Sequence, residues 1–147
     1  MTGVWVLLAT LVVATAAGLL LRARNGRIRA AKPAAATRTA STLPAPVAEA
    51  LDPESAVTLV QISTTFCTPC RHTRAILSSL AEKTDGLHHV DLDVTERPEV
   101  AQALSVLSTP TTLALDPEGR ELLRVGGVPK GPELLEALRP HLTAASH

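Results

Sequence analysis

Two cysteines separated by two residues, Cys67 and Cys70, are the side chains of this sequence best suited to chemistry. Because the chain has no other cysteine, they cannot form the disulfide framework of a small secreted domain. Two thiols at this spacing can close a disulfide and exchange it with another molecule. Pro69 lies between them, and its fixed φ suits the first turn of a helix.

The cysteine pair lies where a strand is expected to give way to a helix. Residues 57–63 (VTLVQIS) are rich in β-branched side chains and predict a buried strand, and the residues after the pair have apolar side chains at helical spacing. At a helix start, unpaired N–H groups and the helix dipole stabilise a thiolate on Cys67, and Arg71 and Arg74 add positive charge. We therefore expect Cys67 to attack a partner disulfide and the more inward Cys70 to resolve the mixed disulfide.

Two other interpretations of the cysteine pair remain open. The pair could be half of a structural zinc site, which needs four ligands, and His72, His88 and His89 are the available extra ones. Adjacent residues of a strand point to opposite faces, so His88 and His89 do not easily bind one ion. The cysteines could also be inert core residues, although a strand-to-helix junction leaves a side chain partly exposed. We expect no metal and no cofactor.

The elements expected around the pair indicate an α/β fold. Strands are predicted at residues 57–63, 90–94, 111–115 and 121–125, and helices at residues 45–51, 67–83, 98–107 and 134–142. The last two strands flank a turn and form an antiparallel hairpin, whereas a right-handed βαβ crossover makes the first two parallel. The result is a mixed sheet flanked by helices.

Ser108-Thr109-Pro110 precedes the strand at residues 111–115, and two roles for the proline are open. It could be an ordinary residue at a strand start, where a missing N–H is tolerated. It could instead follow a cis peptide bond and turn the preceding backbone towards Cys67. Spacing alone does not separate these roles.

Taken together, these motifs resemble the thioredoxin family, in particular its small membrane-anchored members from high-GC bacteria. The resemblance covers about residues 57–142. It implies a thioredoxin-like fold, a protein-disulfide oxidoreductase activity and a redox disulfide between Cys67 and Cys70. It also implies that Pro110 is cis and that substrates contact Phe66, Thr68, Pro69, Thr109 and Pro110, with Thr109 offering backbone groups to an extended segment.

Four features depart from the family pattern. Phe66 stands where the family usually has Trp, and Gln61 stands where it often has a buried Asp that handles the proton of the resolving cysteine. The basic partner of that Asp is replaced by His89. The family's first strand is not evident before residue 57, so either this edge is truncated or residues 45–51 replace the strand.

The N-terminal residues predict a membrane anchor. Residues 4–21 (VWVLLATLVVATAAGLLL) contain no charge over 18 positions, near the lower limit for a helix that spans a bilayer, and Trp5 lies where an interfacial anchor would lie. A buried core helix would show a polar stripe, and a cleaved signal peptide would have a basic segment before the apolar one. We expect an uncleaved single-pass transmembrane helix.

Charge divides the chain into two parts. Six of the 14 basic residues and none of the 14 acidic ones precede residue 46, so the remainder carries eight basic against 14 acidic residues. An acidic domain with few aromatics argues against nucleic-acid binding.

We expect a basic Ala/Pro-rich linker over residues 22–46 and the folded domain over residues 47–147. Cations cluster only after the apolar segment, which predicts the domain on the cytoplasmic side: Arg22, Arg24, Arg27 and Arg29.

The expected function is that of a membrane-tethered thiol–disulfide oxidoreductase acting as a reductase. Its partners would be disulfide-containing protein substrates and a thiol electron donor. One alternative is a non-catalytic binding module that has kept the fold. Another is an outward-facing thioredoxin-like reductant for cytochrome c maturation, although such proteins usually carry a central insertion and here only residues 95–97 separate the expected strand and helix.

Overall fold

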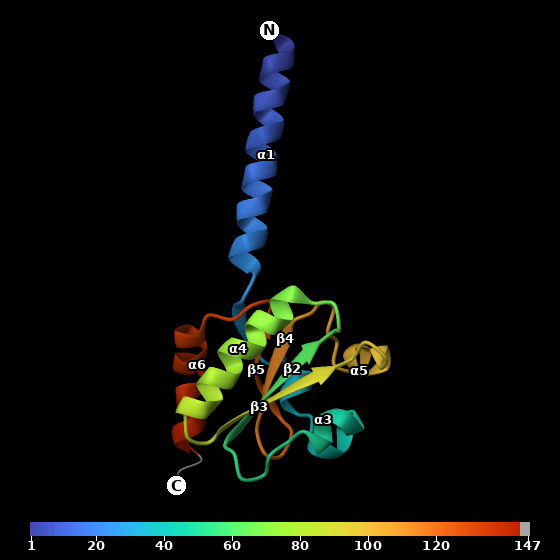
Figure 1. The fold of residues 1–147 in the computed structure, drawn as a ribbon, viewed down its shortest axis with the longest axis vertical. Helices are drawn as coiled ribbons and strands as arrows, with labels where there is room; N and C mark the ends of the chain where they lie inside the picture. The colour runs from blue at the N-terminus through green and yellow to red at the C-terminus, as the bar shows by residue number, and fades with distance from the viewer. Residues whose placement is uncertain (145–147) are drawn as a thin grey trace.

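The structure, a computed structural model, describes residues 1–144 and arranges them as a five-stranded sheet, flanking helices and a separate N-terminal helix (Figure 1). The strands are β1 (Arg27–Ala30), β2 (Val57–Ser63), β3 (Leu87–Asp93), β4 (Thr111–Leu115) and β5 (Glu121–Gly126). The helices are α1 (Thr2–Arg24), α2 (Pro33–Ala36), α3 (Ala45–Glu49), α4 (Thr68–Lys83), α5 (Pro98–Ala103) and α6 (Gly131–Ala144), with a 3-10 turn over Ala40–Thr42.

The sheet is mixed, as the sequence predicts. Its strand order is β1-β5-β4-β2-β3. Strand β2 pairs in parallel with β3 and antiparallel with β4, and β4 forms the expected antiparallel hairpin with β5. The helix α4 makes the crossover between β2 and β3, so the cysteine pair follows the carboxyl end of a central strand.

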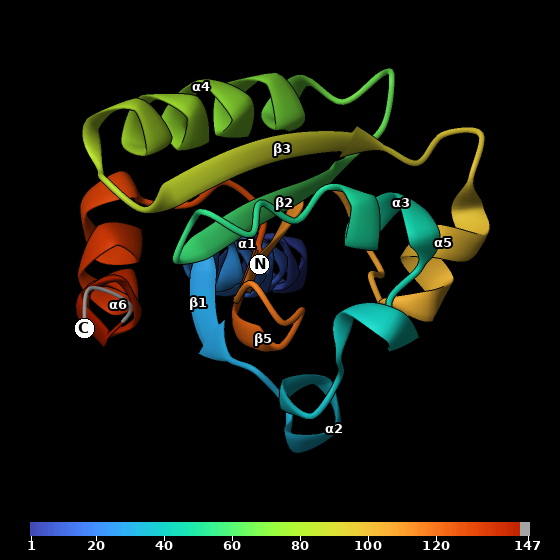
Figure 2. The same cartoon turned by 90° about the horizontal axis from the view of Figure 1, so that it is seen from below.

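Helices cover both faces of the sheet, and the alternation of side chains along β2 explains how (Figure 2). Val57 and Leu59 belong to one apolar cluster with residues of α4 and α6. Val60 and Ile62 belong to a second cluster with residues of α3 and α5. Because β2 is buried on both faces, it has a nearly continuous apolar sequence.

The boundaries of β3 and α5 differ from the predicted ones for identifiable reasons. The strand β3 begins at Leu87, three residues before the predicted start, because the whole segment after Gly86 pairs with β2. The helix α5 ends at Ala103 rather than near Leu107. Ser105 has a φ of 56°, and this left-handed conformation stops the helix although the apolar spacing continues.

Most of residues 22–46, expected to form a basic Ala/Pro-rich linker outside the folded domain, instead belong to helices and a strand. Arg27–Ala30 forms β1, which pairs antiparallel with β5, and Ile28 packs against the α4–α6 side of the core. Leu43, also within the expected linker, joins the cluster on the other face. The sheet order places β1 beside β5, at the edge opposite β3, and residues 45–49 form the helix α3, so they do not replace the strand that is not evident before residue 57.

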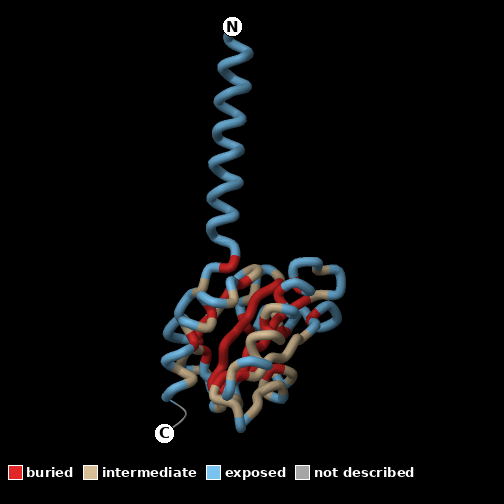
Figure 3. The backbone as a smooth tube through the Cα atoms, turned by 60° about the vertical axis from the view of Figure 1, so that its left-hand side comes forward, coloured by how far each residue is buried: buried red, intermediate tan, exposed pale blue. Residues whose placement is uncertain are grey.

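The helix α1 stands apart from the domain (Figure 3). It contains 23 residues with a mean hydropathy of 2.5 in its most apolar window, and none of its residues is buried. A core helix would be covered by the rest of the protein, so that interpretation does not hold here. A long apolar helix with no protein around it has the length and composition of a membrane span, a property that a signal sequence can share.

Replacing Thr112 by valine should stabilise the fold. Thr112 is 1% exposed and its hydroxyl has no hydrogen-bond partner among the described residues, so the isosteric methyl group removes a buried polar atom at no loss of packing. We expect the free energy of unfolding, from denaturant titration of the full chain in neutral detergent, to rise by about 1 kcal/mol.

Thr58→Val is the matched control, because Thr58 is equally buried on the neighbouring strand β2 but its hydroxyl accepts the Asp52 N–H at 3.2 Å. It should lower the stability by about 1 kcal/mol. Equal effects of the two substitutions would contradict the hydrogen-bond assignment.

Candidate active site

Cys67 and Cys70 are joined in a disulfide at the start of α4, with their Cα atoms 5.2 Å apart. Cys67 is the N-cap residue of α4 and is half-buried, whereas Cys70 is 2% exposed. Cys67 is therefore more accessible to a partner than Cys70, as the sequence predicts. The first sulfur can meet a partner molecule, and the second lies behind it in the core.

The start of α4 provides a positive electrostatic environment for the Cys67 sulfur. The Cys70 backbone N–H donates a hydrogen bond to Cys67 Sγ at 3.2 Å, and the first turn of the helix contains no acidic residue. Pro69 occupies the first turn as expected. An N–H group and a helix dipole directed at a sulfur stabilise its anionic form over the neutral thiol.

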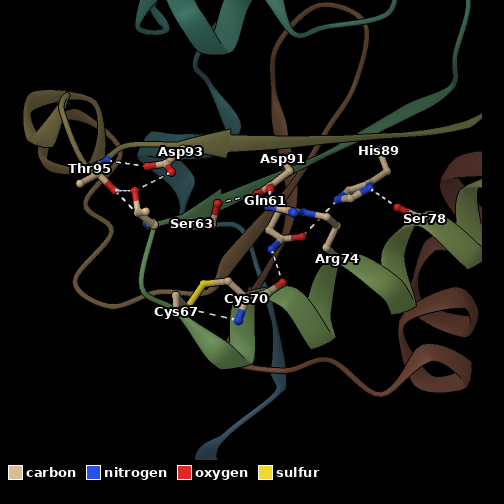
Figure 4. A network of polar contacts seen from close by, with 11 residues as sticks. Gln61, Ser63, Cys67, Cys70, Arg74, Ser78, His89, Asp91, Asp93 and Thr95 are labelled. Carbon is tan, nitrogen blue, oxygen red and sulfur yellow. Dashed lines mark hydrogen bonds and ion pairs between the residues drawn. A yellow bond between two sulfur atoms is a disulfide. The ribbon is translucent and has the colours of Figure 1, made fainter.

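Arg74 does not add the positive charge that the sequence led us to expect. Its guanidinium forms an ion pair with Asp91 on β3, and Ser63 donates a hydrogen bond to the same carboxylate at 2.5 Å (Figure 4). The Arg74 charge is thus largely compensated by Asp91. Of the two expected arginines, only the exposed Arg71 stays outside the described ion pairs.

A chain of hydrogen bonds leads from the buried cysteine into the core. Gln61 is fully buried, and its amide nitrogen donates to the Cys70 carbonyl at 2.8 Å. Its amide oxygen must then accept from His89 Nε2, 3.2 Å away, which makes Nδ1 the acceptor of the Ser78 hydroxyl at 3.1 Å. Gln61 therefore holds the first turn of α4 in place at the position where the family often has a buried Asp.

Burial lowers the pKa of His89 below its ordinary value of 6.5. The Asp91 carboxylate opposes this shift, and the Arg74 and His88 charges reinforce it. A neutral imidazole with one N–H is the form that the Gln61 and Ser78 contacts require, so hydrogen bonding and burial favour the same protonation state.

Acidification should destabilise the fold through His89. Because the pKa of His89 is lower in the folded chain than in the unfolded chain, the unfolded chain takes up this proton first as the pH falls through about 6.5. We expect the urea midpoint of the full chain to fall between pH 7.5 and pH 5.5, and the His89→Gln variant to show a shallower dependence. An identical slope in the variant would exclude His89 as the cause.

A second set of hydrogen bonds holds the loop before Cys67 against the end of β3 (Figure 4). The Thr65 N–H donates to the Thr95 hydroxyl at 2.9 Å, and the Thr65 hydroxyl donates to Asp93 at 3.2 Å. The Thr95 hydroxyl and N–H contacts lower the pKa of Asp93, which keeps this carboxylate an acceptor. These contacts tie the redox loop to the neighbouring strand.

Pro110 is buried and follows a cis peptide bond. The sequence leaves two roles open for this proline, and the structure shows the cis-proline. Its carbonyl accepts the Gly127 N–H at 2.8 Å, and the hydroxyls of Thr109 and Thr64 lie 3.4 Å apart. Thr109 and Pro110 line one pocket with Pro69, which lies between the two cysteines in the sequence. The structure therefore brings the cysteine motif next to the proline loop.

The rim of the site carries exposed apolar side chains. Phe66 is 100% exposed beside Cys67, and Thr68 is also exposed. Leu107, three residues before Pro110, is 98% exposed. The apolar spacing predicts Leu107 on a buried helix face, so the sequence analysis does not identify it as a residue at the rim of the site. Its position directly before Ser108-Thr109-Pro110 is the feature of the sequence that indicates a place near the site.

The histidines considered as zinc ligands do not gather around the cysteines. Among residues 1–144, no group of three or more His, Cys, Asp or Glu side chains is arranged to hold a metal ion. His89 instead bonds Gln61 and Ser78.

Comparisons with known proteins agree with the geometry of the site. The family model for thioredoxin matches residues 39–139. The thioredoxin of Staphylococcus saprophyticus is 33% identical over 90 residues, covering 60% of this chain and 86% of the relative. The thioredoxin of Staphylococcus epidermidis is 36% identical over 90 residues, with the same coverage of both chains.

A solved structure supports the same assignment. The crystal structure of thioredoxin NaTrxh from Nicotiana alata superposes with a TM-score of 0.52 at 31% identity, over 58% of this chain and 73% of that chain. The apolar helix α1 lies outside the residues that the family model matches. With its C-x-x-C disulfide at the start of a helix and the cis-proline loop beside it, the chain belongs to the thioredoxin family of thiol–disulfide oxidoreductases.

Proposed function

We propose that this oxidoreductase is a reductase tethered to the cytoplasmic face of a membrane, with Cys67 as the attacking residue and Cys70 as the resolving residue. The observation that carries the assignment of roles is the difference in exposure: Cys67 is half-buried at the N-cap of α4, whereas Cys70 is 2% exposed. Only a sulfur that a partner can approach serves as the first nucleophile.

The reaction consists of two thiol–disulfide exchanges. In the reduced protein, the Cys67 thiolate attacks one sulfur of the partner disulfide; a mixed disulfide forms, and the other partner sulfur leaves as a thiolate and takes up a proton. Cys70 then loses its proton and attacks the Cys67 sulfur, which releases the second partner thiol and closes the Cys67–Cys70 disulfide. A thiol electron donor returns the pair to the reduced state.

Substrate contacts are proposed for the residues around this centre. Pro69, Thr109 and Pro110 line the pocket next to the disulfide, and Phe66 and Thr68 are exposed beside Cys67. An extended segment of the partner can lie along Thr109 and present its disulfide to the Cys67 sulfur. Exposed apolar side chains such as Phe66 favour protein partners over small thiols.

The anchor and the redox site are connected through a short, tightly packed junction. The Gly26 N–H donates to the Gly126 carbonyl at 2.7 Å, and the next residue, Gly127, donates to Pro110. Gly26 has a φ of 73°, and a Cβ at this position would lie 2.2 Å from the Val128 carbonyl oxygen, so the junction requires glycine. The start of α4 lies at the end of the domain nearest α1, so we expect the site to face the bilayer (Figure 1).

Insulin reduction tests the proposed activity. The full chain in neutral detergent, supplied with dithiothreitol, should precipitate the insulin B chain faster than dithiothreitol alone, and the Cys67→Ser variant should not. The proposal fails if the wild-type chain and the variant give the same rate.

Two measurements on cells test the tether and its orientation. The full chain should stay with membranes after carbonate extraction, whereas a chain cleaved after α1 would be released. A membrane-impermeant thiol reagent should leave the reduced pair unlabelled in intact cells and label it after permeabilisation. Labelling in intact cells would place the domain outside and favour the outward-facing alternative.

A further inference from the structure

A pocket of about 930 Å³ continues the redox site towards the start of the domain. On one side it is lined by Pro69, Thr109 and Pro110, next to the reactive disulfide. On the other side it is lined by β1, α2 and the last residues of α1. The pocket is therefore large enough to hold several residues of a bound polypeptide, and it opens beside the sulfur that a partner must reach.

The pocket is strongly cationic. Its lining includes five basic residues of the folded domain and one carboxylate: Arg27, Arg29, Lys32, Arg38, Arg124 and Glu121. Glu121 is 4% exposed and is occupied by an ion pair with Arg124, with Nε and Oε1 2.7 Å apart. None of the ion pairs found among residues 1–144 neutralises the first four cations.

Two of these cations are placed in ways that an external anion would stabilise. The register of β1 and β5 sets Arg29 directly opposite Arg124, whose charge Glu121 already balances, so no carboxylate on this side of the sheet is left to pair with Arg29 among the described ion pairs. Nη1 of Arg38 is buried and has no hydrogen-bond partner among the described residues. An anionic group in the pocket would pair with Arg29 and accept the hydrogen bond of Arg38 Nη1.

We propose that this pocket binds an acidic segment of the partner protein next to its disulfide, so that the enzyme selects disulfides flanked by Asp and Glu. The inference rests on the proposed function and names its substrate class. Continuity with Pro69 and Pro110 favours a polypeptide, because the chain that fills the pocket is then the chain that carries the disulfide. Charge complementarity of this kind acts mainly by accelerating association.

The test uses three synthetic peptides that share one disulfide-closed core and differ in a flanking run of Glu, Gln or Lys. The full chain is reduced, placed in neutral detergent and mixed with each peptide, and acid-quenched samples give the second-order rate of exchange. At about 20 mM salt we expect the Glu peptide to react about tenfold faster than the Gln peptide and the Lys peptide to react more slowly still. The differences should shrink at about 0.5 M salt.

A charge-matched pair of variants locates the effect. Arg29→Gln/Lys32→Gln should lose most of the preference for the Glu peptide while keeping the rate for the Gln peptide, which also reports on correct folding. Lys83→Gln/Arg139→Gln removes the same charge at exposed positions of α4 and α6 outside the pocket and should keep the preference.

The outcomes separate this inference from the proposed function. Absence of exchange with every peptide would overturn both. Equal rates for all three peptides would overturn the acidic-segment inference and leave the oxidoreductase activity standing. Equal rates, together with binding to phosphatidylglycerol vesicles that Arg29→Gln/Lys32→Gln weakens and the control does not, would assign the pocket to lipid headgroups instead.

Discussion

Replacing Cys67 by serine should lower the rate of disulfide exchange by at least about a hundredfold, the largest effect expected of any single substitution. The half-buried Cys67 sulfur is the one that a partner can reach, and Cys70 is too buried to replace it. The measurement is insulin reduction by the full chain in neutral detergent. The fold should be unaffected, because serine keeps a side-chain acceptor for the Cys70 N–H at the N-cap of α4.

The companion variant Cys70→Ser separates the two roles. It should still attack a disulfide through Cys67 but should stall as a mixed disulfide, since no second sulfur is present to release the partner. Mass spectrometry of the unreduced product should find one partner molecule joined to Cys67. Accumulation of such an adduct in the Cys67→Ser variant instead would mean that the roles are reversed.

Replacing Gln61 by leucine should cause the second large effect, a loss of about 2–4 kcal/mol in the free energy of unfolding. Gln61 is fully buried and bonds both the Cys70 carbonyl and the His89 ring. The leucine would remove the side-chain hydrogen bond to the Cys70 carbonyl and leave the His89 N–H without its partner in the core. Urea unfolding of the oxidised full chain measures the loss.

A double-mutant cycle tests the cause of that loss. His89→Leu removes the His89 N–H that Gln61→Leu leaves unpaired, so the double variant should be more stable than the sum of the single effects predicts. We expect a coupling of about 1 kcal/mol. Strict additivity would indicate that the cost comes from packing and not from the Gln61–His89 hydrogen bond.

The parts of the fold that the sequence predicts are those with a strong local signal. The apolar β-branched run of β2, the turn between β4 and β5 and the apolar spacing of α6 each indicate the right element. The chemistry at Cys67 and Cys70 is predictable for the same reason, because the helix start that activates a thiol follows directly in the sequence from the strand that positions it.

The parts that the sequence does not predict depend on distant partners. The segment Arg27–Ala30 has one well-packed apolar residue, Ile28, and becomes a strand only because the edge of β5 is available. Arg74 is neutralised by Asp91, which lies on another element. The cationic pocket is also a product of tertiary structure, since it forms only when the basic segment folds back beside Pro110.

The central claim is that the start of α4 makes Cys67 an accessible, readily ionised thiol. The pH dependence of alkylation tests this most directly. Iodoacetamide is added to the full-length Cys70→Ser variant, which has one thiol and keeps the backbone N–H that faces it. We predict a half-maximal rate well below pH 8.5, where an ordinary cysteine ionises, and a return to that value when the chain is unfolded in guanidinium. A half-maximal rate at or above pH 8.5 in the folded chain would contradict the account.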